Sequence, residues 1–185
     1  MQDYKEVLAE VLIDEKTLQN RIAELGAEIS RDYQGMDLIL ICILRGGMIF
    51  LVDLMRHITV PHMMDFMAVS SYGAGARETS GSVRVTYDLQ TDIRGKDVLL
   101  IEDIVDSGNT IASVLEFLQT RQPRSLKVCT LLDKDERREA VVPIHYRGFR
   151  IPNKFVFGYG LDLDEYYRNL PFVGVVDLEK YKPPA

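Results

Sequence analysis

The chain has 185 residues, of which 46% are hydrophobic and 27% are charged, and both values are ordinary for a globular protein. This length is enough for one domain with a substantial core and does not require a second domain. The formal net charge of -6 argues against a nucleic-acid-binding surface, which needs a basic patch, so we expect no nucleic-acid partner.

The cysteines and the apolar stretches indicate the compartment. Cys42 and Cys129 both lie inside apolar runs, and we expect two buried thiols rather than a disulfide. The first residues lack the apolar region of a secretory signal, and charged residues interrupt the longest apolar stretches before they reach the roughly 20 residues that span a bilayer. We therefore expect a cytoplasmic protein that does not enter a membrane.

The first part of the chain alternates between helix and strand patterns. Asp14 can cap a helix over residues 14–33, whose apolar stripe is formed by Leu18, Ile22, Leu25 and Ile29. Residues 37–44 form a nearly unbroken apolar run, which is typical of a strand buried on both faces. The pattern then predicts a turn at Arg45, Gly46 and Gly47, a helix over 48–56 and a strand over 63–71.

Residues 72–95 form a long polar segment that contains several glycines. Within it, residues 83–87 alternate between apolar and polar side chains, as in an exposed hairpin strand. Long irregular loops in compact domains are usually functional or mobile. Two interpretations remain open here: a lid that closes over a site, or an ordinary exposed excursion of the chain.

The second part of the chain continues the alternation. A buried strand is predicted to begin at Val98, and the helix that follows places Ile111, Val114, Leu115 and Leu118 on one face. Further strands are predicted over 125–132, 154–157 and 173–177, with a charged and irregular stretch over 133–150. This order predicts an α/β fold with a mostly parallel central sheet flanked by helices, in which ligands bind beyond the carboxyl ends of the strands.

Residues 98–110 carry the strongest chemical signal. The predicted strand ends in Glu102 and Asp103, and Asp106 then opens a run of small residues that leads into a helix. A strand end, a tight loop and a helix N-terminus together favour a phosphate, whereas ionised carboxylates suit ligand hydroxyls or Mg²⁺. The combination indicates a phosphorylated sugar, most simply ribose 5-phosphate. The alternative, on residue chemistry alone, is a solvated strand edge.

Two further features narrow the chemistry. Asp106 would lie between phosphate and sugar, where a carboxylate favours a cationic transition state at the sugar C1, and Arg45 could hold a second anion such as pyrophosphate. The chain contains neither a P-loop motif nor a dinucleotide-binding glycine motif. Its three histidines, at 57, 62 and 145, do not have the spacing of metal ligands.

Residues 98–110 resemble the phosphoribosyl pyrophosphate (PRPP) motif of type I phosphoribosyltransferases: an apolar strand, two acids, two apolar residues, then Asp-Ser-Gly-Asn-Thr. Over residues 7–177 the chain is similar to the bacterial-type hypoxanthine-guanine phosphoribosyltransferases. Leu44 to Gly47 resembles their pyrophosphate loop, Ser71 to Gly73 the start of their mobile catalytic loop, and residues 149–170 their purine-binding segment.

This resemblance implies one phosphoribosyltransferase domain over residues 1–185. Its core would span about 35–145, a small hood would combine about 1–15 with 146–185, and a mobile loop would span about 72–95. The implied activity is a glycosyl transfer of purine salvage: Mg²⁺-dependent transfer of ribose 5-phosphate from PRPP to hypoxanthine or guanine, giving IMP or GMP and pyrophosphate. The resemblance also implies a homodimer or homotetramer.

Carried over position by position, the resemblance implies roles for individual residues. Asp106 would be the general base or acid near purine N7, Glu102 and Asp103 would engage the ribose hydroxyls directly or through Mg²⁺, and Asp162 would join a second Mg²⁺ site. The remaining implied contacts are Ser107, Gly108, Asn109 and Thr110 with the 5′-phosphate; Arg45, Gly46 and Arg168 with pyrophosphate; Lys134 with the purine 6-oxo group; Phe155 stacked on the base; Val156 at the purine edge; and Ser71 and Tyr72 at the start of the catalytic loop.

Several of these residues have a simpler interpretation. Without the family, Lys134 would be a solvated lysine, Phe155 a core residue, Arg168 a surface arginine and Tyr72 a loop anchor. Two positions depart from the family pattern: Arg45 stands where some relatives have lysine, and Asn109 where others have a basic residue. Neither change removes an anion-binding capacity, because an arginine also binds anions and the loop keeps its backbone N–H groups.

Two other functions also fit the motif. The chain could be a phosphoribosyltransferase for another base such as xanthine, or a regulatory protein that kept the fold and binds RNA or a nucleotide without turnover. The complete set of acids and the negative net charge disfavour the regulatory alternative.

Overall fold

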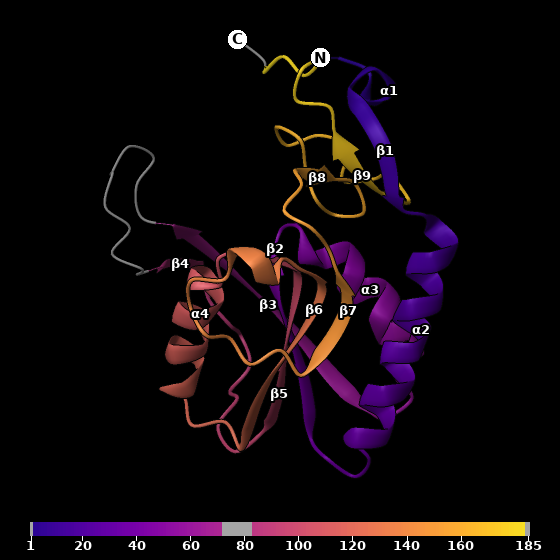
Figure 1. Ribbon diagram of the computed structural model, residues 1–185. Coiled ribbons are helices and arrows are strands. Elements are labelled where there is room, and N and C mark those ends of the chain that lie inside the picture. The colour runs from indigo at the N-terminus through magenta and orange to yellow at the C-terminus, as the bar shows by residue number, and fades with distance from the viewer. Residues whose placement is uncertain (1, 72–82, 184–185) are drawn as a thin grey trace.

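The computed structural model describes residues 2–71 and 83–183. The elements in chain order are α1 (Tyr4–Val7), β1 (Leu8–Ile13), α2 (Glu15–Asp32), β2 (Leu38–Leu44), α3 (Gly47–His57), β3 (His62–Ser71), β4 (Val83–Tyr87), β5 (Asp97–Val105), α4 (Asn109–Gln119), β6 (Ser125–Asp133), the one-turn 3₁₀ helix η1 (Asp135–Arg137), β7 (Tyr146–Arg150), β8 (Val156–Phe157) and β9 (Val173–Val176). They form a six-stranded core sheet and, above it, a three-stranded hood sheet that carries both chain ends (Figure 1).

The core sheet has the strand order β4-β3-β2-β5-β6-β7. Every neighbouring pair is parallel except β3 with β4, which is antiparallel. Helices α2 and α3 cover one face of the sheet and α4 covers the other (Figure 1). The expected mostly parallel α/β fold is confirmed.

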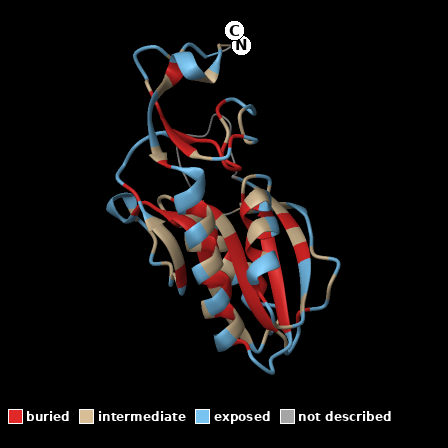
Figure 2. Cartoon of the chain, turned by 90° about the vertical axis from the view of Figure 1, so that its right-hand side faces the viewer, coloured by how far each residue is buried: buried red, intermediate tan, exposed pale blue. Residues whose placement is uncertain are grey.

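The unbroken apolar pattern of β2 follows from this layering. Leu40 and Cys42 pack in the cluster that contains α2 and α3, whereas Ile39 and Ile41 pack in the cluster that contains α4. Because both faces are covered, neither set of alternating residues meets water, and the central strands are buried throughout (Figure 2). Burying such a side chain stabilises the fold by about 1.5–3 kcal/mol.

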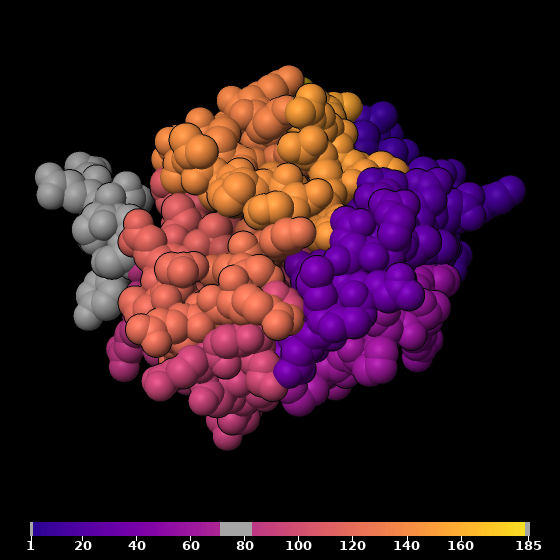
Figure 3. Space-filling view, turned by 90° about the horizontal axis from the view of Figure 1, so that it is seen from below, coloured from indigo at the N-terminus to yellow at the C-terminus, as the bar shows by residue number. Residues whose placement is uncertain are grey.

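Helix α2 forms as its sequence predicts. The Asp14 carboxylate caps it by accepting from the backbone N–H of Thr17 at 2.8 Å, and the four predicted stripe residues are fully buried. On the partly buried side, Arg21 donates to the carbonyls of Arg147 and Gly148. These bonds hold α2 against a segment more than 100 residues later in the chain, and the early and late parts of the chain meet in the view from below (Figure 3).

The hood sheet has the order β1-β9-β8, with both pairs antiparallel. It has a small core of its own, formed by Val7, Phe157, Leu163, Leu170 and Val176. Since β1 near the start of the chain pairs with β9 near its end, the hood sheet combines segments from both ends of the sequence.

The structure corrects the sequence-based prediction for residues 146–150. We expected this stretch to be irregular and to belong to the hood, but it forms β7 at the edge of the core sheet, parallel to β6. An edge strand needs no continuous apolar run, and this one runs from a buried tyrosine through three partly buried residues to an exposed arginine. Gly148 lies against the carbonyl of Leu131 so closely that an added Cβ would overlap it.

Other expected elements differ less from the structure. The predicted hairpin strand is confirmed as β4, while residues 72–82 of the expected lid lie outside the described residues. The strand expected over 154–157 is shorter, since β8 covers Val156 and Phe157 alone.

Cys42 and Cys129 are free and buried as expected, and burial raises the pKa of both thiols. Within the described ranges, no helix is both long enough and apolar enough to cross a membrane.

A buried polar contact ties the hood to the core. The Tyr159 hydroxyl donates to Asp53 Oδ2 on α3 at 2.5 Å, and Gln19 of α2 donates to the same carboxylate oxygen at 3.0 Å. Tyr159 is 3% exposed, and burial raises the pKa of its hydroxyl. The next residue, Gly160, has φ of +96° and lies against the carbonyl of Gly46, where a Cβ would overlap that oxygen.

We expect Tyr159→Phe to lower the free energy of unfolding by about 1.5 kcal/mol, since a hydrogen bond to a carboxylate is lost in a buried place. Urea unfolding of the purified variant measures this. Tyr87→Phe is the matched control, because Tyr87 is largely exposed on β4. Equal stability of the two variants would contradict the proposed tie.

Candidate active site

A cleft of about 550 Å³ lies between the core sheet and the hood. It opens at the carboxyl ends of β2, β3 and β5, where the fold class places ligands. Its lining residues are Ile43, Leu44, Arg45, Gly46, Ala68, Val69, Thr86, Glu102, Asp103, Asp162 and Arg168. The structure therefore brings together acids and arginines that are up to 123 residues apart in the sequence and that the sequence had singled out separately.

Gly46 and Asp103 define the floor of this cleft. The Asp103 carboxylate lies so close to the Gly46 backbone that an added Cβ would overlap it. Gly46 has an ordinary φ of -61°, so the glycine is required here by the close approach rather than by its conformation. Asp103 is held in this position by the backbone N–H of Ile104, which donates to Oδ1 at 2.7 Å.

The two adjacent carboxyls are short of positive partners. Glu102 Oε2 is buried and has no hydrogen-bond partner among the described residues. Burial, together with the neighbouring Asp103, raises the pKa of Glu102 well above its ordinary value. Burial also raises the pKa of Asp103 to about 6, although the Ile104 N–H and Arg168 oppose the shift. Both groups would ionise more readily beside a cation or ligand hydroxyls.

The residues after Asp106 form a loop that suits an anion. Gly108 has φ of +86°, which favours glycine, and α4 begins at the next residue. The first N–H groups of a helix have no acceptor within the helix, so those of α4 face this loop. Ser107 Oγ accepts from the Asn109 N–H at 3.4 Å, and the Asn109 side chain donates to Glu139 at 2.7 Å.

Lys134 and Asp106 face each other across the ends of β5 and β6. The Lys134 side chain is 7% exposed, and its Nζ lies 3.5 Å from Asp106 Oδ2. Its backbone N–H donates to the carbonyl of Val105 at 2.9 Å, which fixes the loop after β6 against β5. The interpretation of Lys134 as a solvated lysine is wrong. A buried ammonium beside Asp106 is a hydrogen-bond donor that a ligand at the end of β5 can use.

Two groups around this pair were not indicated by the sequence. Arg137 Nη1 lies 3.4 Å from Asp106 Oδ2. Arg137 is the last residue of η1, the single helical turn that begins directly after Lys134. Asp133 is buried and forms ion pairs with Arg138 and Arg147, so it anchors the residue before Lys134. The signal for both was the charged run after a buried strand, which the sequence alone does not distinguish from a solvated surface.

Phe155 and Val156 belong to the hood side of the site. A second hollow of about 650 Å³ is lined by Phe155, Val156, Leu161, Asp162, Asp164 and Glu165. Phe155 is 51% exposed, so its interpretation as a core residue is wrong, and its ring is accessible to a flat ligand. Val156 is buried in β8 and pairs with Val175. Asp162 lines both hollows and links the hood side to the cleft.

Arg168 is held by its surroundings rather than free on the surface. Its Nη1 donates to the carbonyl of Gly160 at 2.8 Å, and its Nη2 lies 2.9 Å from Asp162 Oδ1 and 3.1 Å from Glu165 Oε2. Glu165 also reaches Arg45 Nη2 at 2.7 Å. The two arginines expected at a pyrophosphate are thus joined through one carboxylate.

Ser71 and the histidines lie at the margin of the site or outside it. Ser71 is the last residue of β3, and Tyr72 lies outside the described residues. Among the histidines, His145 Nδ1 accepts from the backbone N–H of Val128 at 3.1 Å, which is a structural role. No group of three or more potential metal ligands occurs within residues 2–71 and 83–183.

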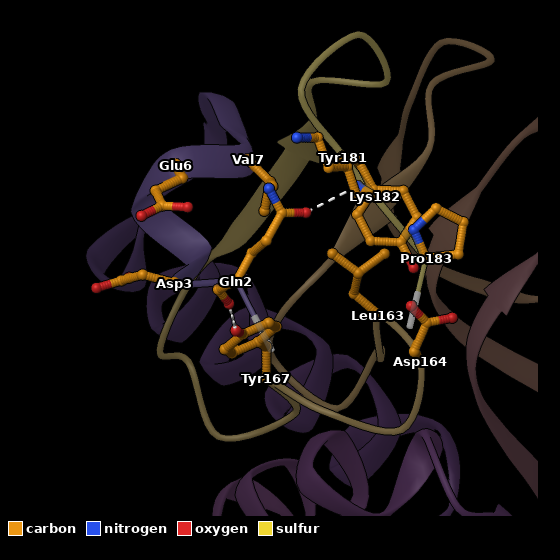
Figure 4. A pocket seen from close by; sticks show the side chains of 10 residues that line it. All are labelled: Gln2, Asp3, Glu6, Val7, Leu163, Asp164, Tyr167, Tyr181, Lys182 and Pro183. Carbon is orange, nitrogen blue, oxygen red and sulfur yellow. Dashed lines mark hydrogen bonds between the residues drawn. The ribbon is translucent and has the colours of Figure 1, made fainter. Parts of the chain in front are cut away.

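Another hollow, of about 390 Å³, lies at the far end of the hood between the N-terminal and C-terminal segments (Figure 4). Tyr167 donates to the carbonyl of Gln2, and the Gln2 side-chain oxygen accepts from the Lys182 N–H at 2.7 Å. These bonds join the two chain ends. No predicted site residue lines this hollow, so it is not the candidate active site.

Comparison with known proteins adds to this geometry. Residues 12–164 match the model of the phosphoribosyl transferase domain. The chain belongs to the phosphoribosyl transferase family. The matched span contains the whole core sheet, the loop from Asp106 to Thr110 and the part of the hood that follows β7 as far as Asp164.

Relatives of this phosphoribosyltransferase cover nearly its whole length. The hypoxanthine phosphoribosyltransferase of Salmonella typhimurium is 52% identical over 171 residues, covering 91% of this chain and 96% of that protein. The hypoxanthine-guanine phosphoribosyltransferase of Mycobacterium avium is 52% identical over 178 residues, covering 93% and 87%. A solved hypoxanthine phosphoribosyltransferase from Staphylococcus aureus has a TM-score of 0.93 and 46% identity, and 97% of each chain is covered.

Because the pKa of Asp103 is raised, we expect the free energy of unfolding of the ligand-free phosphoribosyltransferase to depend on pH. Between about pH 4 and pH 6 the folded protein keeps a proton that the unfolded chain has lost, so the free energy of unfolding falls as the pH rises through this range. Asp103→Asn removes this titration. We expect the free energy of unfolding of the variant, relative to that of the wild type, to increase by about 2–3 kcal/mol between pH 4 and pH 7.

Urea unfolding of both proteins across pH 4–7 measures this difference. A stability difference that is constant over the range would contradict the burial of an ionising carboxyl at this position.

Proposed function

We propose that this phosphoribosyltransferase catalyses the Mg²⁺-dependent transfer of ribose 5-phosphate from PRPP to N9 of hypoxanthine or guanine, giving IMP or GMP and pyrophosphate, as an enzyme of purine salvage. The observation that carries the proposal is the buried Lys134 beside Asp106, at the end of the strand that also carries Glu102 and Asp103. It is supported by relatives named for hypoxanthine and guanine that are 52% identical over more than nine-tenths of this chain.

PRPP would bind across the carboxyl ends of β5 and β2. The 5′-phosphate would meet the N–H groups and side chains of Ser107, Gly108, Asn109 and Thr110, because a helix N-terminus there provides unpaired donors. The ribose hydroxyls would donate to Glu102 and Asp103. The pyrophosphate would lie against the Gly46 backbone between Arg45 and Arg168, since guanidinium groups bind phosphates through paired N–H donors.

The donors in the cleft fit a magnesium ion. Mg²⁺ is usually held by one or two carboxylates together with substrate oxygens and water, so the pair of Glu102 and Asp103 is sufficient for one ion, and Asp162 could serve a second. The buried, unpartnered Glu102 Oε2 is the specific observation in its favour. When bound, the ion would neutralise the charge of the pyrophosphate and of these carboxylates.

The purine would lie between the hood and the Asp106 loop. Phe155 offers an exposed ring for stacking, and Val156 offers its backbone at the edge of the base. Lys134 Nζ would donate to the 6-oxo oxygen. This bond would favour 6-oxopurines over adenine, because the 6-amino group of adenine is itself a donor and cannot accept from an ammonium.

Asp106 would act at the reacting centre. As the bond between C1 and pyrophosphate weakens, positive charge develops at C1, and a carboxylate nearby stabilises it. Asp106 would also exchange a proton with purine N7. Its two cationic neighbours, Lys134 and Arg137, hold its side chain in place. Ser71 and Tyr72 would begin a catalytic loop over residues 72–95 that excludes water from the reacting centre.

The assay that tests the proposal follows absorbance as PRPP and Mg²⁺ are mixed with hypoxanthine, guanine, xanthine or adenine. We expect turnover with hypoxanthine or guanine and little with adenine. A strong preference for xanthine would favour the alternative of a xanthine enzyme. Absence of turnover with all four bases would contradict the proposal and favour a binding protein that kept the fold.

We expect Asp106→Asn to lower kcat by about 10²–10⁴-fold, the usual contribution of a general acid or base, while the affinity for PRPP changes little. Steady-state kinetics with hypoxanthine and calorimetric binding of PRPP measure the two effects. Equal turnover of variant and wild type would remove Asp106 from the acid–base role.

We expect Lys134→Ala to lower kcat/KM for hypoxanthine by about 10–100-fold, because a charged hydrogen bond to the base is lost. Lys96→Ala is the matched control, since Lys96 pairs with Asp37 at the opposite end of the strands. If both variants use hypoxanthine as well as the wild type does, Lys134 does not contact the base.

The assembly and compartment follow as parts of the same proposal. We propose a homodimer or homotetramer of single-domain subunits, with the hood and core sheets forming one catalytic unit, in the cytoplasm. Two free, buried thiols suit a reducing compartment. Light scattering on the purified protein measures the subunit number.

A further inference from the structure

Glu165 links the two arginines that we assign to pyrophosphate. Its Oε1 lies 2.7 Å from Arg45 Nη2, in the turn between β2 and α3, and its Oε2 lies 3.1 Å from Arg168 Nη2, in the hood. One carboxylate therefore bridges two guanidinium groups from segments more than 120 residues apart. It uses the donor groups that a phosphate oxygen would need.

The backbone that carries Glu165 has a well-defined and unusual conformation. Asp164, Glu165 and Tyr167 have φ values of +51°, +71° and +67°, a left-handed conformation that side-chain-bearing residues rarely adopt. The Glu165 N–H donates to Asp162 Oδ2 at 2.8 Å, and Leu163 and Tyr166 form a bridge on either side of it. Strained residues of this kind persist where the surroundings determine them and are concentrated at functional sites.

The position of Glu165 is unusual for a binding site of anions. The cleft already contains Glu102, Asp103 and Asp162, so a fourth carboxylate works against the binding of a polyanion. Glu165 itself lines the neighbouring hollow beside Phe155 rather than the cleft floor. Its side chain is about half exposed, at 57%, so it can rotate into solvent without disturbing the turn that carries it.

We infer that Glu165 is an internal counter-anion of the pyrophosphate subsite. In the free protein its carboxylate neutralises Arg45 and, together with Asp162, Arg168, and pyrophosphate displaces Glu165 from both guanidinium groups on binding. Competition from a tethered carboxylate weakens pyrophosphate binding and speeds the departure of this product. The inference rests on the proposed function for the assignment of the subsite, whereas the bridge itself is a feature of the structure.

The bridge also joins the hood to the pyrophosphate loop. Arg168 contacts the carbonyl of Gly160, and Gly160 lies against the carbonyl of Gly46. The donors released by Glu165 are therefore already arranged on both sides of the cleft. Displacement of one side chain, rather than rearrangement of the hood, is sufficient to admit the anion.

Calorimetric titration of the full-length protein with pyrophosphate and Mg²⁺ tests the inference. Glu165→Gln keeps the size of the side chain and removes its charge, and we expect this variant to bind pyrophosphate about fivefold more tightly than the wild type, the effect of removing two exposed ion pairs. Glu24→Gln is the matched control, because Glu24 forms an exposed pair with Arg21 at 2.8 Å on α2, away from the cleft. It should bind as the wild type does.

Kinetics separate this role from a structural one. For Glu165→Gln we expect the KM for PRPP and the inhibition constant of pyrophosphate to fall together, with the KM for hypoxanthine unchanged. Glu165→Ala should show the same direction, and thermal unfolding of both variants reports whether the turn is intact. A general loosening of the hood would instead raise the KM for hypoxanthine.

The outcomes distinguish this inference from the proposed function. Unchanged or weaker pyrophosphate binding by a folded Glu165→Gln variant would overturn the inference, even if the wild type forms IMP. Tighter binding by the variant would support it. A wild type that forms no nucleotide with any base would contradict the proposed function, while the binding comparison still decides whether Glu165 competes with pyrophosphate.

Discussion

Asp103 places its carboxylate directly against the backbone of Gly46, and the carbonyl of Gly46 is met by Gly160 of the hood. Three segments far apart in the sequence can converge at this point because two of them lack a Cβ. The end of β5, the turn after β2 and the hood therefore share one contact. The cleft, its acids and its arginines all depend on that approach. A methyl group at either glycine would force apart the elements that carry Glu102, Arg45 and Arg168.

The same close packing creates an electrostatic cost. Asp103 and the Oε2 atom of Glu102 are buried after the apolar run of β5, and the pKa values of both carboxyls are raised because burial disfavours their ionised forms. Around them the protein supplies positive groups at a distance, with Arg168 bonded to Asp162 and Arg45 bonded to Glu165. The free protein is thus less stable at neutral pH than an uncharged site would make it. Substrate hydroxyls and a bound cation would offset this cost, so the features that destabilise the free site are those that favour its ligand.

Much of the fold could be predicted from the sequence because the central strands are buried on both faces. The continuous apolar runs of β2 and β5, the cap at Asp14 and the stripe of α2 all have local signatures, and the structure confirms them. Strand β7 has no such signature, since an edge strand can carry arginines among its apolar residues. Lys134, Arg137 and Glu165 lie in charged runs that resemble solvated surface. Their positions are set by contacts with distant residues, which no local pattern records.

The end of β5 is proposed to bind one PRPP molecule at two places: the ribose at the acids of the strand and the 5′-phosphate at the loop that follows it. A crystal structure of the protein soaked with PRPP and Mg²⁺, in the absence of a base, measures this directly. The account predicts ribose hydroxyls and Mg²⁺ in contact with the carboxylates of Glu102 and Asp103, and the 5′-phosphate on the N–H groups of Ser107 to Thr110. A ribose or phosphate bound away from β5, with both carboxylates contacting protein groups alone, would contradict it.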